Sequence, residues 1–243
     1  MAVGILGVAT GGVVAARRRA TARRNDPFED WVTRFRLSHE ALRRNLRHFV
    51  ELIDGQGSSD VDAFGEFVGL NAKFLIVHHE SEDRIIFPTL RRHGRLRSTD
   101  AAHLEKWSSE HREVNALGEA LMRAGRGIRD GERGPLLEIR RLSQKLEALL
   151  APHLAAEEEV LTPGHLAEMA PASAIADIDR LGRKLFGGER GIPLFFAHSL
   201  QPDEQKQVFG AAPWIFRRVI FPLMDRRGFS RFRPLSLSPA LAP

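Results

Sequence analysis

Apolar residues recur at three- and four-residue steps over four long stretches of the chain, with polar residues between them. This spacing is typical of amphipathic α-helices, whose apolar side chains gather on one face. The first stretch opens at Asp26-Pro27, an acidic cap followed by proline at the first helical position. The pattern predicts helices at about 26–55, 59–94, 99–127 and 135–164.

Short glycine-rich segments separate these four stretches. Long amphipathic helices joined by short turns predict an all-α fold, namely an antiparallel up-down-up-down four-helix bundle. Weaker helical patterns follow near 171–186 and 202–210, so we expect a C-terminal helical extension. The expected organisation is a basic N-terminal tail without fixed structure at residues 1–25, the bundle at 26–164 and the extension at 165–243.

Polar side chains interrupt the apolar stripes at positions where an inward-facing apolar residue is expected. A buried carboxylate without a partner costs several kcal/mol, and a buried imidazole needs partners for its nitrogens. Coordination of metal ions would satisfy both kinds of side chain at once. The interrupting residues are two glutamates and four histidines, spread over all four helices: His39, His78, Glu82, His111, His153 and Glu157.

Two of these helices carry the same short motif. The pairs are His78 with Glu82 and His153 with Glu157, and each is followed by a second acid, two apolar residues and a proline. Residues four apart lie on one face of a helix, so each motif presents an imidazole and a carboxylate together. Two such pairs on two helices can hold two metal ions between them.

This pattern of histidine and glutamate resembles the hemerythrin family, specifically its bacterial hemerythrin-like branch with the HHE cation-binding domain. The resemblance covers about residues 27–163. It implies a non-haem centre with two iron ions and with oxygen or a peroxide as the small-molecule ligand. In that centre four histidines would be terminal ligands and two glutamates would bridge the irons: His39, His78, His111 and His153, with Glu82 and Glu157.

One position departs from the oxygen-carrying members of that family. They place a second histidine one turn before the third-helix ligand, and this chain has Trp107 there. His79 could supply the missing imidazole if the second helix is rotated slightly, so we include it as a weaker candidate ligand. Alternatively Glu80 or Glu158 could lean toward the metals, or water could fill the place. A more open iron would favour reaction with peroxide, or sensing, over reversible oxygen carriage.

Three functions remain open from these observations. The first is a cytoplasmic di-iron protein that binds oxygen or a related small oxidant for sensing, storage or detoxification. The second is a di-iron enzyme that consumes peroxide or nitric oxide. The third is an interaction protein whose metal site is structural. The oligomeric state is left open as well.

Composition narrows the metal chemistry. The chain has no Cys and no Tyr, which excludes disulfides, iron–sulfur clusters, thiolate zinc sites and tyrosine ligands. Any metal must therefore bind histidine and carboxylate, a ligand set that suits iron, manganese or zinc. The spacing of the residues does not choose among these metals, and only the family resemblance selects iron.

The net charge of +5 is unevenly distributed. Residues 1–25 hold five arginines and no acid, and residues 214–243 hold six arginines and one aspartate, so the part between carries 5 − 5 − 5 = −5. Basic ends on an acidic body do not predict a nucleic-acid-binding protein. They suit solubility, or weak contact with an anionic membrane surface.

Two apolar segments outside the bundle leave alternatives open. The segment of residues 2–16 is too short and too rich in glycine to form a membrane-spanning helix. We interpret it as a disordered tail, a weak membrane anchor or the product of a misassigned start site. Residues 213–224 are apolar and aromatic with flanking arginines. They either pack on the bundle or form an amphipathic surface for a membrane or a partner.

Overall fold

The computed structural model describes residues 26–54, 60–93, 95–128, 134–187, 191–210 and 214–237. Every element in these ranges is helical, which confirms the all-α class. The expected N-terminal tail at residues 1–25, with its basic charge and its apolar run, lies outside the described residues.

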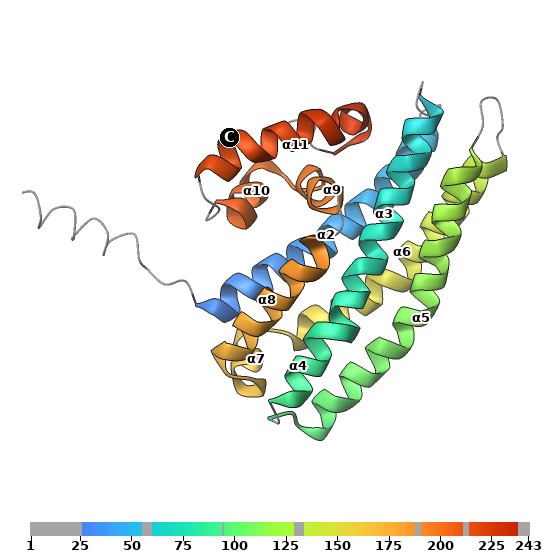
Figure 1. Cartoon of the computed structure of the whole chain (residues 1–243). Helices are drawn as coiled ribbons and strands as arrows, with labels where there is room; N and C mark the ends of the chain where they lie inside the picture. The colour runs from blue at the N-terminus through green and yellow to red at the C-terminus, as the bar shows by residue number, and fades with distance from the viewer. Residues whose placement is uncertain are drawn as a thin grey trace, which may run out of the picture.

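Four long helical segments lie side by side and correspond to the four apolar stripes (Figure 1). They are α2 (Pro27–Asp54), α3 (Val61–Ser81) with its continuation, α5 (Ser98–Gly127) and α6 (Gly134–Val160). The continuation of α3 is a π-helical turn, η1 (Glu82–Ile86), followed by α4 (Phe87–Arg92). α3 packs on α5, α5 on α6, α6 on α2 and α2 on α3, so the four helices surround a common interior.

Capping residues fix where these helices begin. The carboxylate of Asp26 accepts a hydrogen bond from the backbone N–H of Phe28 at 2.9 Å, with Pro27 at the first helical position. The carboxylate of Asp60 accepts one from the backbone N–H of Ala63 at 2.9 Å. Both bonds satisfy N–H groups that have no partner within the helix.

Two apolar clusters fill the bundle, one on each side of the polar residues that interrupt the stripes. The first lies at the α4 end of the bundle, and its members include Trp31, Phe35, Phe87, Leu104, Trp107 and Leu161. The second is larger and reaches into the extension, and its members include Leu42, Phe49, Phe67, Leu75, Leu121 and Leu146.

Glycine faces glycine where α3 crosses α5. A Cβ atom on Gly65 would lie 2.3 Å from the carbonyl oxygen of Gly125, and one on Gly125 would lie 2.6 Å from the carbonyl oxygen of Gly65. Any larger side chain at either position would push the helices apart. This close approach holds together the two helices that supply three of the histidines described below.

The C-terminal extension packs on the α2 and α3 side of the bundle (Figure 1). α7 and α8 contact α2, whereas α9 and η3 contact α3. The helices expected near 171–186 and 202–210 are confirmed as α8 and α10. The extension comprises α7 (Pro163–Met169), α8 (Ala172–Gly187), α9 (Ile192–His198), α10 (Pro202–Phe209), η2 (Phe216–Ile220), α11 (Phe221–Gly228) and the 3₁₀ helix η3 (Ser230–Leu235).

A buried ion pair ties α11 to α9. His198 is buried, and its Nε2 lies 2.6 Å from a carboxylate oxygen of Asp225. Arg233 donates to the other oxygen of Asp225, and the ring of Phe229 stacks on the imidazole with centroids 4.2 Å apart. The apolar stretch near 213–224 therefore has an inner side that packs, where Phe221 is buried, and an outer side that is exposed. Among the described residues, none of the helices combines the length and apolar character needed to cross a bilayer.

Candidate metal centre

The six residues predicted from the interrupted stripes lie together inside the bundle, and His79 lies with them. All seven side chains are buried, and four helical segments supply them. The set is His39 from α2, His78 and His79 from α3, Glu82 from η1, His111 from α5, and His153 and Glu157 from α6.

Within the described part of the chain, many inward-facing atoms of this group have no hydrogen-bond partner. They are Nε2 of three histidines and both carboxylate oxygens of the two glutamates: His39, His78 and His79, with Glu82 and Glu157. Leaving a polar atom buried and unpartnered is costly, and native proteins rarely do so without a reason. Nitrogen lone pairs and carboxylate oxygens that face one another in a dry interior are the donor set that a transition-metal cation requires.

Glu82 faces histidines on two sides. One of its oxygens lies 3.2 Å from Nε2 of His78, and the other lies 3.3 Å from Nε2 of His111. The carboxylate thus lies between an imidazole of α3 and an imidazole of α5. The two oxygens of Glu82 therefore face imidazoles that come from two different helices.

Glu157 has the same arrangement with the other two helices. One of its oxygens lies 3.5 Å from Nε2 of His39, and the other lies 3.4 Å from Nε2 of His153. Both glutamates therefore stand between the α2/α3 imidazoles on one side and the α5/α6 imidazoles on the other. The repeated motif in the sequence corresponds to this repeated geometry.

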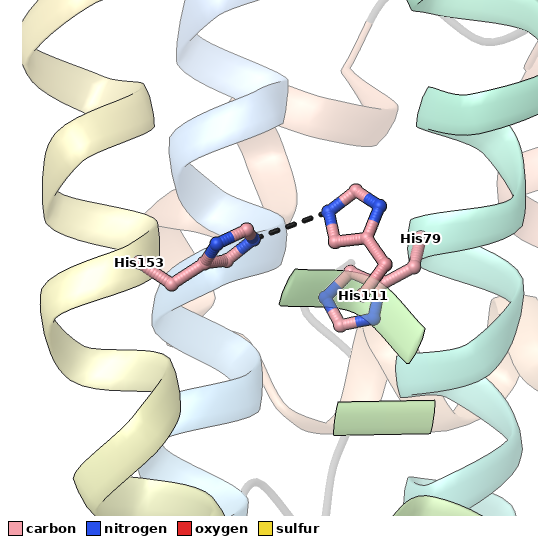
Figure 2. A group of neighbouring side chains, drawn as sticks. All are labelled: His79, His111 and His153. Carbon is pink, nitrogen blue, oxygen red and sulfur yellow. Dashed lines mark hydrogen bonds between the residues drawn. The ribbon is translucent and has the colours of Figure 1, made fainter. Parts of the chain in front are cut away.

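The ligand atoms fall into two groups, and within each group they lie within 4.8 Å of one another. One group is His79, His111 and His153, and the other is His39, His78, Glu82 and Glu157. Figure 2 shows the three imidazoles of the first group converging from three helices. Nε2 of His111 and Nε2 of His153 are only 3.2 Å apart. Two ring nitrogens at this distance repel each other unless a proton or a cation lies between them.

The outer nitrogens of four imidazoles are held by acceptors from neighbouring helices. Because a carboxylate or an amide oxygen can only accept, Nδ1 must carry the proton, and the lone pair of Nε2 then points inward. Such partners fix the orientation of metal-binding histidines. The pairs are His39 with Glu158 at 2.8 Å, His79 with Asn115 at 2.9 Å, His111 with Asp83 at 3.0 Å and His153 with Glu110 at 2.8 Å.

Two of these four acceptors, Asp83 and Glu158, are the second acids that follow the motif glutamates in sequence. Sequence reasoning missed the other two, Glu110 and Asn115. Both lie on α5, next to the apolar stripe, but they bond histidines of α6 and α3. No spacing rule within one helix connects a residue to a partner on another helix, so the sequence held no signal for these pairs.

Burial sets the protonation of the centre. It lowers the pKa of His78 and of His79 well below the ordinary value of 6.5, and the neighbouring imidazoles lower both further. Burial raises the pKa of Glu82 well above its ordinary value of 4.5, and the nearby Glu157 and Asp83 add to that rise. The interior therefore disfavours the protonated form of His78 and His79 and the ionised form of Glu82. Burial also acts against protonation of His111, but the hydrogen bond to Asp83 and the nearby Glu157 raise the pKa of that imidazole. A cation bound among these side chains would reverse the effect on Glu82.

The orienting acids behave in the opposite way. Burial works against ionisation of Asp83 and Glu158, yet hydrogen bonds from His111 and His39 hold the pKa of each below its usual range. Ser108 also donates to Asp83, and Arg43 also donates to Glu158. These acids remain ionised and keep the Nδ1 proton in place.

A π-helical turn positions the first motif. The backbone N–H of Phe87 bonds the carbonyl oxygen of Glu82, five residues earlier, instead of the usual four. π turns insert one extra residue and occur often at functional sites. His78 and His79 lie in the last turn of α3 before this π-helical turn, and both are buried, although adjacent helical residues normally point in directions about 100° apart.

The structure places His79, and not the side chain of Trp107, beside the other buried imidazoles. Trp107 is a core side chain whose ring lies 6.0 Å from that of Phe87. His79 instead lies in the centre, stacked on His111 with centroids 4.2 Å apart. Glu80 extends toward Arg84, at 3.9 Å, and Glu158 bonds the outer nitrogen of His39, so neither contributes an oxygen to the group of ligand atoms.

A comparison with known protein families identifies the domain that contains this site. The hemerythrin HHE cation binding domain matches residues 31–163, which is more than half of the chain and contains every residue of the centre. The comparisons with curated proteins and with solved structures found no match. The matched segment carries the buried histidines and glutamates on all four long helices, and the chain therefore belongs to the hemerythrin HHE cation-binding domain family.

Proposed function

We propose that this chain is a non-haem di-iron protein that binds oxygen or a related small oxidant, for sensing, storage or detoxification. The observation that carries the proposal is the position of two buried glutamates, each with one oxygen toward one group of imidazoles and one toward the other. A single ion needs no such arrangement. Two ions with shared carboxylates account for all four glutamate oxygens.

The five imidazoles fit two ions, with two imidazoles on one ion and three on the other. His39 and His78 would bind one ion, and His79, His111 and His153 would bind the other. Glu82 and Glu157 would be shared. The iron pair would supply the redox chemistry toward the oxidant. The ion with two imidazoles has fewer protein ligands, so the small molecule would bind on that side.

The rest of the chain would keep this chemistry dry and correctly oriented. Phe35 packs against His39 with centroids 4.2 Å apart, and Phe87 lies against His111 at 5.9 Å. The two apolar clusters close the centre above and below. Water is thereby excluded from both faces, and the acids behind the imidazoles hold their Nδ1 protons outward.

The order in which the helices enter the two clusters supports the antiparallel up-down-up-down bundle that we infer. α2 runs from the α4-end cluster at Trp31 to the larger cluster at Phe49, and α5 runs the same way. α3 with α4 runs in the opposite direction, and so does α6, which is followed directly by Leu161 of the α4-end cluster. Each helix crosses the metal centre between the two clusters.

His79 also bears on the choice among functions. The case for a peroxide- or nitric-oxide-consuming enzyme rested on an open iron beside Trp107. With His79 inside the centre, the count of five imidazoles and two carboxylates is complete without that position. We therefore favour binding of the oxidant over its turnover.

Elemental analysis of full-length protein, purified without added metal, tests the proposal. We expect two irons per chain and an optical spectrum under air that changes when oxygen is removed. His79→Ala should lower the iron content, whereas Trp107→Phe, at the position of the missing histidine, should keep both irons. One ion per chain in the wild type, or full iron content in His79→Ala, would contradict the assignment. Two irons with no optical response to oxygen would exclude oxygen as the ligand.

A further inference from the structure

A pocket of ≈ 850 Å³ lies between the bundle and the C-terminal extension. Residues of α2 and α3 form one side, and residues of α8, α9 and α10 form the other, in the region where the extension crosses the bundle in Figure 1. Its walls are mostly apolar and aromatic, and they include Trp31, Phe35, Phe74, Ile86, Ile192 and Phe196. Because α8, α9 and α10 lie beyond residue 163, the matched domain alone does not form this pocket.

The few charged groups of the pocket sum to a positive charge. Arg34 donates to both oxygens of Asp179, each at 2.9 Å, so these two charges cancel. Arg183 also lines the pocket, is exposed, and has no ion pair among the described residues. One uncompensated guanidinium therefore stands at the edge of an apolar space.

The pocket also touches the metal centre. His78 is part of its lining, and Phe35, another lining residue, packs against His39. A molecule in the pocket would lie against the imidazole of the two-histidine group. The pocket itself, however, is formed by apolar packing and by Arg183, so its existence does not depend on which metal the bundle holds.

We propose that this pocket binds an amphipathic organic monoanion, such as a medium-chain carboxylate. Its volume is in the range of small-molecule sites, which are mostly apolar with a few placed polar groups. The apolar part of the ligand lies between α2, α3 and the extension, away from water. The carboxylate pairs with the guanidinium of Arg183, whose planar donors match it. The bound chain then lies against His78.

Gly182 offers a way to fill the pocket without disturbing its walls. This residue lines the pocket within α8, and a Cβ added there would have no atom within 4 Å. A tryptophan at position 182 can therefore occupy the space that the ligand needs. Gly69, within α3, is a matched control: a Cβ there also meets nothing within 4 Å, and Gly69 does not line the pocket.

Trp31 supplies a local readout, because it is one of the lining residues. Bromine quenches tryptophan fluorescence at short range, so 10-bromodecanoate should quench Trp31 when it binds. The titration uses the full chain with Trp214→Phe, which removes the exposed indole. It is run on protein as purified and on zinc-loaded protein. Trp107 is buried in the α4-end cluster and does not line the pocket.

We expect saturable quenching in both metal states. Charge reversal in Arg183→Glu should weaken binding of 10-bromodecanoate by about tenfold and leave the neutral 10-bromodecanol unchanged. Gly182→Trp should abolish binding of unlabelled decanoate, measured by calorimetry, whereas Gly69→Trp should bind decanoate as the wild type does. The proposal is overturned if quenching does not saturate, or if the alcohol and the acid respond equally to Arg183→Glu. Wild-type binding by Gly182→Trp would also overturn it.

A second, independent observation concerns the outer surface of the extension. Among the described residues, six of the seven exposed large apolar side chains lie on one segment, residues 214–224. They are Trp214, Ile215, Val219, Ile220, Leu223 and Met224. The seventh, Leu137, lies apart on α6. So many exposed large apolar side chains on one short segment indicate an interaction surface.

Arginines accompany this segment. Arg218, Arg226 and Arg227 are exposed and have no ion pair among the described residues. The opposite side of α11 is already packed, because Phe221 and Asp225 are buried. We infer that the exposed face lies on an anionic lipid surface, with Trp214 and the aliphatic side chains at the acyl boundary and the arginines at the phosphates.

Cosedimentation of the full chain with vesicles tests this surface. We expect binding to vesicles of phosphatidylglycerol and phosphatidylcholine, weaker binding at high salt, and no binding to phosphatidylcholine alone. Leu223→Asp should remove the binding, and Leu137→Asp, at an exposed leucine of α6, should retain it. The inference fails if the wild type stays in the supernatant, or if Leu137→Asp has the same effect. It also fails if ultracentrifugation shows only self-association that Leu223→Asp abolishes.

Discussion

Two regions of this molecule bury histidine beside carboxylate, and they solve the problem differently. In the extension, His198 donates to one oxygen of Asp225 and Arg233 donates to the other. In the bundle, Glu82 and Glu157 bring four oxygens to the buried imidazoles, and none of those oxygens has a hydrogen-bond donor among the residues that the structure describes. The first region is a closed ion pair. The second is complete only with cations.

The difference shows which observation identifies a metal centre. A buried histidine next to an acid is common to both regions, so burial and proximity alone do not distinguish them. The unpartnered Nε2 atoms of His39, His78 and His79 do distinguish them. The Nδ1 atoms of His39 and His79 already donate hydrogen bonds to Glu158 and Asn115. A structural histidine and a candidate metal ligand thus differ in the second ring nitrogen. In the candidate ligand, its lone pair points toward other unpartnered ligand atoms.

The sharpest way to break the comparison is to remove a shared carboxylate. Glu82→Ala should lose most of the bound metal, because both groups of imidazoles lose a common ligand. Elemental analysis should show less than one ion per chain. For the wild type, a chelator should lower the free energy of unfolding by about 4 kcal/mol relative to protein with metal at about 1,000 times its dissociation constant. A variant that kept two ions would disprove the bridging role.

The mirror experiment is His198→Ala. It leaves Asp225 with the guanidinium of Arg233 but removes the buried hydrogen bond to its other oxygen, which should destabilise the protein by about 2 kcal/mol. The metal content should not change, because this pair lies outside the centre. Denaturant unfolding and elemental analysis on one preparation measure both quantities. Loss of metal in His198→Ala would show that the two regions are coupled and that our separation is wrong.

The pH dependence of the metal-free protein should sharpen the contrast. The pKa of His78 and of His79 is lowered in the folded state, so below about pH 6.5 the unfolded chain binds protons that the folded chain does not. Stability should therefore fall as the pH is lowered from 7.5 to 5.5. The pKa of Glu82 is raised, so this group acts in the opposite direction and adds stability as the pH falls toward 4.5.

Thermal melts of metal-free variants separate these two contributions. His79→Gln should show a shallower loss of stability on acidification than the wild type, and Glu82→Gln should show a steeper one. Identical slopes for the wild type and both variants would mean that the buried groups do not titrate as their surroundings indicate.

The smallest expected effect is at the acids and amides behind the imidazoles. Glu158→Gln and Asn115→Leu each weaken the support of one Nδ1 proton, and such changes typically reduce metal affinity by about 10- to 100-fold. Competition with a chromogenic chelator measures the affinity. Glu80→Gln is the matched control, because Glu80 lies next to the centre in sequence but extends toward Arg84. If Glu80→Gln lowers the affinity as much as Glu158→Gln, the orienting role is not specific.

The helices and most members of the buried histidine and glutamate cluster could be predicted, because both depend on local periodicity. The caps at Asp26 and Asp60 and the glycine-rich segments set the helix bounds within a few residues. A residue four positions after a histidine shares its face by helical geometry alone, so Glu82 and Glu157 followed directly. The choice between His79 and Trp107 did not follow, because it depends on how α3 and α5 are rotated about their own axes.

The sequence alone determined an all-helical protein with a histidine- and glutamate-lined interior, because the 3.6-residue period couples positions within one helix. The tertiary structure decided everything that joins separate helices. Packing between helices brought His79 inward beside His111 and placed Asn115 behind His79 and Glu110 behind His153. It also closed an apolar pocket beneath the extension. Contacts between helices depend on rotation, depth and crossing angle, and the periodicity of a single helix does not specify these quantities.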